Sequence, residues 1–128
     1  METMRLFSIG WVLVVAVSVS ACDFWPKDLK PFADSISRQV SGETTAWLVG
    51  GDVIVITVAK SPVYHADQPE LEAQATDIAK QAIAYTETAL ESIAITFYEG
   101  EVADDEEKMR EFIFLVMENR PVLQPYLN

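Results

Sequence analysis

Apolar side chains recur at helical spacing in two segments of the chain. In residues 32–40 the apolar positions fall on one face. Pro31, which suits the first turn of a helix, precedes them, and Gly42, which can end a helix, follows. After Asp67 an apolar residue recurs every three or four positions for roughly 20 residues, and Asp67 and Glu70 have the spacing of a capping box. We therefore expect two amphipathic helices, of which the second is longer.

Two neighbouring segments, 43–49 and 53–59, are rich in Val, Ile, Thr and Trp, which favour strands. The turn residues 50–52 separate them, so we expect a β-hairpin. With a two-residue loop, Trp47 would lie opposite an isoleucine of the second strand and share its face. The second strand is apolar on both faces, which predicts a central position in its sheet.

Alternating apolar and polar residues over 93–98 predict a strand with one buried face. Residues 109–118 fit two structures, because their β-branched and aromatic content favours a strand while their apolar positions also fit a helix. We choose the strand, which forms a second hairpin with 93–98 across an acidic loop. Residues 119–121 then turn the chain into a short segment, 122–124.

Together these elements predict a small single α+β domain with the order α-β-β-α-β-β. We expect a mainly antiparallel sheet that carries its helices on one face.

The chain has 128 residues, and its 20 acidic and 9 basic side chains give a formal net charge of −11. Such a surface repels polyanions, so we expect no binding to nucleic acid and no adsorption to anionic lipid through a basic patch. A basic partner protein, or a well-solvated surface alone, fits this charge. Half of the residues are hydrophobic, which is typical of a globular chain and not of a disordered one.

Residues 1–22 have the pattern of an export signal. A short, weakly positive start precedes the apolar run 6–19, which is too short for a comfortable membrane span of about 20 residues. At its end stand an aliphatic residue, two small residues and the only cysteine of the chain. These four residues, Val19, Ser20, Ala21 and Cys22, resemble the lipobox of bacterial lipoproteins. The alternatives are an ordinary signal peptide and an uncleaved buried helix.

The resemblance implies cleavage before Cys22 by the lipoprotein signal peptidase, a diacylglyceryl group on the Cys22 sulfur, and commonly a further acyl chain on the new amino terminus. It also accounts for an unpaired cysteine, which would be a liability in an oxidising compartment. The chain then divides into a signal peptide (1–21), a lipidated cysteine with a short membrane-proximal segment (22–30) and the α+β domain (31–128). Asp23 resembles the residue that retains some lipoproteins in the inner membrane, so we favour that membrane.

Few residues carry the chemistry of a catalytic or metal site. A hydrolase needs a base beside a nucleophile, and the only histidine is His65. Tyr64, Asp67 and Ser61 lie near it in sequence. The acidic run 99–107 offers oxygen ligands to a hard cation such as calcium, but it lacks the spacing of a dedicated loop. We therefore predict no catalytic residue, no resident metal and no cofactor.

These features predict a membrane-anchored lipoprotein with its domain in the periplasm or extracytoplasmic space, acting as a non-enzymatic binding or assembly accessory for another envelope component. A module that binds a small ligand or calcium is the alternative. A small hydrolase built around His65 is the third hypothesis.

Overall fold

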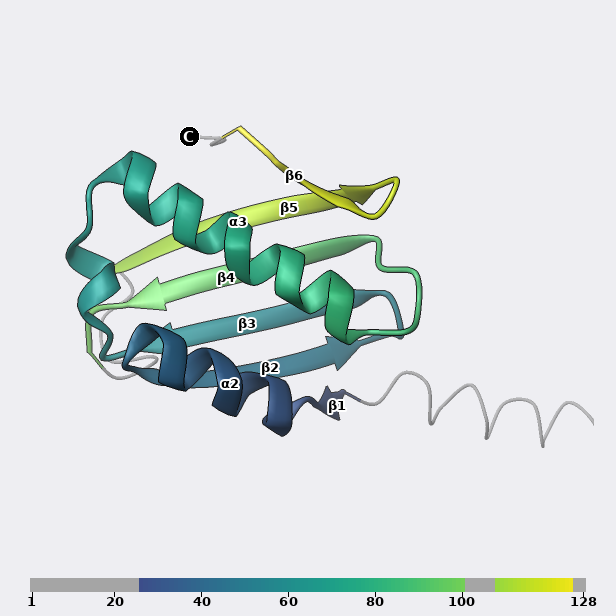
Figure 1. The fold of residues 1–128 in the computed structure, drawn as a ribbon, viewed down its shortest axis with the longest axis horizontal. Coiled ribbons are helices and arrows are strands. Elements are labelled where there is room, and N and C mark those ends of the chain that lie inside the picture. The colour runs from purple at the N-terminus through teal and green to yellow at the C-terminus, as the bar shows by residue number, and fades with distance from the viewer. Residues whose placement is uncertain (1–25, 101–107, 126–128) are drawn as a thin grey trace, which may run out of the picture.

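The computed structural model describes residues 26–100 and 108–125, which form one six-stranded sheet and two α-helices (Figure 1). In chain order the elements are β1 (Lys27–Asp28), α2 (Lys30–Val40), β2 (Glu43–Val49), β3 (Val53–Ala59), the 3-10 turn η1 (Pro62–His65), α3 (Gln68–Tyr85), β4 (Ser92–Tyr98), β5 (Met109–Met117) and β6 (Arg120–Leu123). The predicted small α+β domain is confirmed, with a short strand added at each edge of the sheet. No helix in these two ranges is both long and apolar enough to span a membrane.

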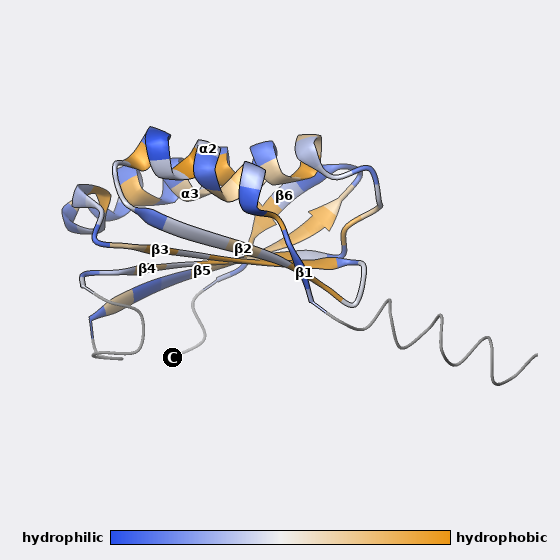
Figure 2. Ribbon diagram, turned by 90° about the horizontal axis from the view of Figure 1, so that it is seen from below, coloured by the Kyte–Doolittle hydropathy of each residue, from blue (hydrophilic) through white to orange (hydrophobic). Residues whose placement is uncertain are grey.

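The strands lie side by side in the order in which they occur in the chain. Every neighbouring pair is antiparallel except β3 and β4, which run parallel because α3 carries the chain back along the sheet between them. Both α-helices lie over the same face of the sheet (Figure 2). The sheet is therefore mixed, and the parallel pair is a feature that the sequence pattern did not indicate.

The core lies between the sheet and the two helices. The inward side chains Ile56 of β3, Ile95 of β4 and Phe114 of β5 have no exposed surface. Ile36 of α2 and Ile78 of α3 belong to the same buried cluster and are equally inaccessible. The apolar faces of the helices and of the strands therefore pack against each other in one core layer, as amphipathic elements require.

The loop between β2 and β3 is one residue longer than expected, and this changes the face on which Trp47 lies. Val49 pairs with Val53, so residues 50–52 all belong to the loop, and Trp47 pairs with Val55. Both glycines of the loop have positive φ, 64° and 83°, which glycine adopts without steric cost. The predicted pairing of Trp47 with an isoleucine is therefore wrong. Trp47 lies opposite Val55, on the face away from the helices, and is 39% exposed.

The helices begin and end close to the predicted positions, but the residues at their ends act differently. Ser41, and not Gly42, adopts the left-handed conformation that ends α2. Gly42 is needed for a close approach: a Cβ there would lie 2.7 Å from Ser61 Cβ and 2.8 Å from the carbonyl oxygen of Ala59. Asp67 is the N-cap residue of α3, as predicted, but its side chain makes no capping hydrogen bond.

Residues 109–117 form strand β5, so the choice of strand over helix is confirmed. β5 pairs with β4 in antiparallel fashion, as the predicted second hairpin requires. The turn into β6 comes earlier than expected. Met117 pairs with Arg120, and the two residues between them, Glu118 and Asn119, both have positive φ, as in a tight two-residue hairpin turn.

The residues just before α2 also belong to the folded unit. β1 pairs with β2 at Leu48 and Trp47, and Leu29 is buried in the core. The five residue steps from Cys22 to Lys27 span at most about 18 Å of extended chain. A lipid on Cys22 would therefore hold the domain close to the membrane surface.

Candidate functional site

The sheet face that carries neither α-helix is here called the open face. The register of the strands shows which residues lie on it. Side chains alternate between the two faces of a strand, so cross-strand partners share a face. Two adjacent rows of such partners cross the open face from β2 toward β6. The first row is Trp47, Val55, Ala94 and Ile113, and the second is Val49, Val53, Ser92, Leu115 and Val122. Between β2 and β6, Ser92 is the single polar member of these rows, and none of them is charged. At the edge of the sheet, Asp28 of β1 pairs with Trp47 and continues the first row.

The two rows and the neighbouring Met117 are here called the apolar half of the open face. Ile113 is 45% exposed and Met117 58%, and Leu115 and Val122 are each 40% exposed. From β2 to β6 this surface is roughly 19 Å wide and roughly 14 Å long, a footprint of roughly 270 Å². That approaches the roughly 300–600 Å² of the largest apolar patch on a typical monomer, a patch that is often functional.

The other end of the open face, here called the polar half, consists mainly of hydroxyl and carboxylate groups. The hydroxyls of Thr45 and Thr57 hydrogen-bond to each other across β2 and β3. Thr96 on β4 donates to a carboxylate oxygen of Glu111 on β5, over 3.4 Å. Along the strands, the side chains of the open face therefore change from apolar at one end to polar at the other.

Strand β5 shows why the sequence did not identify this surface. Phe112 and Phe114 point into the core and are buried, whereas Ile113 and Leu115 between and beyond them lie on the open face. A strand that is apolar on both faces indicates that both faces are covered. For β3, apolar residues on both faces predicted a central strand. β5 has the same pattern, but within the described residues nothing covers the side chains that it places on the open face, which indicates that another surface covers them.

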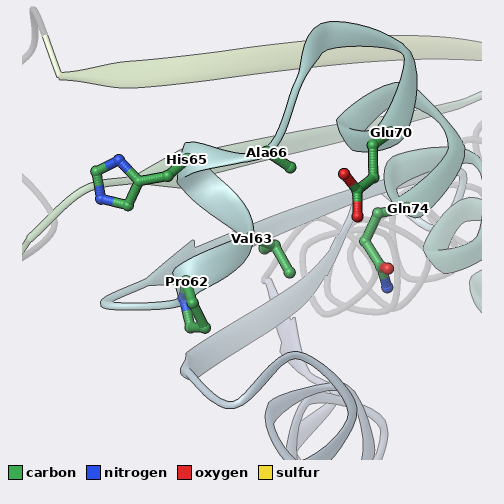
Figure 3. A pocket seen from close by; sticks show the side chains of 6 residues that line it. All are labelled: Pro62, Val63, His65, Ala66, Glu70 and Gln74. Carbon is green, nitrogen blue, oxygen red and sulfur yellow. The ribbon is translucent and has the colours of Figure 1, made fainter.

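The only histidine lies beside a shallow groove at the start of α3. The groove has a volume of about 320 Å³ and is lined by Pro62, Val63, His65, Ala66, Glu70 and Gln74. Figure 3 shows the exposed His65 ring directed away from the side chains of Glu70 and Gln74. The ring instead meets Tyr64 edge-on, with 5.2 Å between the ring centroids.

Ser61, the serine nearest to His65 in sequence, is buried, and its hydroxyl hydrogen-bonds to backbone groups. Its hydroxyl donates to the carbonyl oxygen of Val40 and accepts from the backbone N–H of Val63. Within residues 26–100 and 108–125 no hydrogen bond joins His65 to a hydroxyl or a carboxylate. The structure therefore does not bring His65, Ser61 and Asp67 together as a catalytic group.

The candidate calcium ligands are placed only in part. Glu99 is described, and its carboxylate forms an ion pair with Lys108 at 3.4 Å. Positions 101–107 lie outside the described residues. Among those that the structure does describe, no three His, Cys, Asp or Glu side chains lie close enough together to hold a metal ion.

The predicted lipidation residue Cys22, the three lipobox residues before it, Val19, Ser20 and Ala21, and the sorting residue Asp23 all lie outside the described residues. Their assignment continues to rest on the sequence pattern.

Arg110 is a structural residue that the sequence analysis did not single out. It lies on β5 and is half-buried, and its guanidinium reaches η1, the residues that follow η1 and the first residue of α3. Nη1 donates to the carbonyl oxygens of Tyr64, at 2.9 Å, and Ala66, at 2.7 Å. Nη2 donates to Oε1 of Gln68 at 2.6 Å. One side chain of the sheet thus fixes the start of α3.

Comparisons with models of protein families, with curated proteins and with solved structures find no match to this chain.

Proposed function

We propose that this chain is a lipid-anchored protein of the bacterial envelope that acts by binding another envelope component, without catalysing a reaction, and that its open face is the docking surface. The apolar half of that face carries the proposal, because it gathers exposed apolar side chains from β2, β5 and β6 and its two rows hold no charged side chain between β2 and β6. The lipobox at Cys22 supports the anchor. Asp23 favours the inner membrane, with the domain in the periplasm or extracytoplasmic space.

The size of the apolar half limits how tightly it can bind. Covering roughly 270 Å² on each of two partners contributes about 13 kcal/mol at about 25 cal/mol per Å². Association costs an estimated 4–15 kcal/mol in lost translational and rotational freedom alone. The net affinity in solution is therefore modest, and a partner confined to the same membrane fits this surface better than a freely diffusing one.

The anchor is tested on the natively expressed protein by intact mass and membrane fractionation, beside a Cys22→Ala variant. We expect loss of residues 1–21, added acyl mass and membrane association, all abolished in the variant. A clipped but unacylated protein, or one that fractionates away from the membrane, would contradict the anchoring part of the proposal.

The docking surface is tested by placing a photo-crosslinking amino acid at Ile113, on the open face, in intact cells. The control position is Ala73, which is exposed on α3 on the opposite side of the domain. We expect a protein crosslink from position 113 and none of comparable yield from position 73. Equal yields at both positions would contradict the assignment of the open face as the docking surface.

A further inference from the structure

We infer that the occupant of the open face is a second copy of this chain, packed sheet against sheet across a two-fold axis. This inference rests on the proposed docking role of the open face and names the partner. It follows from three properties of the apolar half: its shape, the placement of charge around it, and its area.

The shape suits packing of one sheet on another. Two sheets stack about 10 Å apart with their strands nearly aligned, and the side chains of the facing surfaces interdigitate. An axis that runs across the strands, between the two apolar rows, places the first row of each copy over the second row of the other. The branched side chains of Ile113 and Leu115 on β5 would then meet Leu115 and Ile113 of the second copy. The contact is isologous and closes on itself, as in most homo-oligomers.

The placement of charge favours this axis over one that runs along the strands. The two apolar rows hold no charged side chain between β2 and β6, so the centre of the contact desolvates none. Asp28, which pairs with Trp47, and Arg120, which pairs with Met117, lie at its edges. An axis across the strands points the polar halves, with Glu111, in opposite directions.

The area predicts a weak dimer that depends on the anchor. Exposed side chains present their flanks as well as their tips, so the accessible area buried on each copy exceeds the footprint. A pair would therefore bury more than the roughly 540 Å² of its two footprints, at the low end of the range for protein–protein contacts. Two copies anchored through Cys22 in one membrane meet at a raised effective concentration, and such confinement strengthens a weak contact.

The test uses the full chain, co-expressed with two different C-terminal tags, chemically crosslinked in the intact membrane and only then solubilised in mild detergent. We expect the two tagged copies to co-purify, and Ile113→Glu in both copies to lower the yield of the second tag at least tenfold. Ala73→Glu adds the same charge on α3 and should leave the yield unchanged. Val122→Glu, on β6 at the same face, repeats the test should Ile113→Glu fold poorly. All variants keep the anchor. If the two tagged copies co-purified only because they shared a micelle by chance, the yield of the second tag would be the same for the parent and for every variant.

The outcomes separate the inference from the proposed function. The photo-crosslinked product at position 113 should have the mass of two copies, which supports the dimer. A product that contains a different protein overturns the dimer and leaves the docking role standing. Crosslinks to lipid alone overturn both. Co-purification that survives both open-face substitutions also overturns the dimer through this face.

Discussion

Arg110 should be the most important polar side chain for the stability of the domain, because three hydrogen bonds from one guanidinium join β5 to the start of α3. A hydrogen bond to a charged group contributes about 1.5–3 kcal/mol when it is partly buried. Two of the three bonds go to half-buried carbonyl oxygens, of Tyr64 and Ala66. The third goes to an exposed glutamine and contributes little. Water can reach the carbonyls once the guanidinium is gone, which lowers the total.

We therefore expect Arg110→Ala to reduce the free energy of unfolding by about 2–3 kcal/mol, equivalent to a fall in Tm of about 10 °C or more for a domain of this size. Arg110→Lys should recover only part of the loss, because an ammonium cannot present a planar fork to several acceptors. The assay is urea unfolding followed by circular dichroism. The matched control is Arg120→Ala, since the Arg120 side chain is exposed on β6 and makes no hydrogen bond or ion pair within the described residues. Surface changes of that kind cost less than about 0.5 kcal/mol. If Arg110→Ala unfolds within about 0.5 kcal/mol of the parent, the structural role given to Arg110 is wrong.

Three further substitutions test the fold by the same unfolding assay. Gly42→Ala should cost about 1–3 kcal/mol, because the added methyl would overlap Ser61 and force the backbone to shift, whereas Gly100→Ala meets nothing within 4 Å and should be close to neutral; equal effects would refute the close approach. Ser61→Ala should cost about 1–3 kcal/mol by leaving a buried carbonyl without its donor, and no change in stability would argue against that bond. Ile56→Ala should cost about 2–5 kcal/mol, since the side chain is fully buried, and a cost below about 1 kcal/mol would contradict its place in the core.

The elements that sequence predicted well are those whose signal is local. Ile54, Ile56 and Val58 alternate with less buried residues and form a central strand, and the helix after Asp67 begins where its capping residues stand. Their period and end signals depend only on neighbouring residues, so no knowledge of the tertiary fold was needed. The choice of strand for residues 109–117 rested on β-branched and aromatic content and was also correct.

The features that sequence missed depend on distant partners or on a single residue of register. The side-by-side parallel placement of β3 and β4 depends on how α3 packs, which no local pattern records. One extra loop residue between β2 and β3 put Trp47 opposite Val55 on the open face, and not on the face of the isoleucine it was expected to oppose, because side chains alternate with a period of two. The candidate docking surface was missed for that reason, and because Ile113 and Leu115 are as apolar as core residues.

The most direct test of the open face as a docking surface is the rate at which a cysteine at position 113 reacts with a membrane-impermeant maleimide, compared with a cysteine at position 73. Each single substitution is made in the natively anchored protein, in which Cys22 is expected to be consumed by lipidation, and labelling is followed under reducing conditions in membranes and again after unfolding. If the open face is covered in the envelope, position 113 reacts at least tenfold more slowly than position 73 until the protein is unfolded. Equal labelling of the two positions in the folded, anchored protein would show that the face is bare and would contradict the proposal.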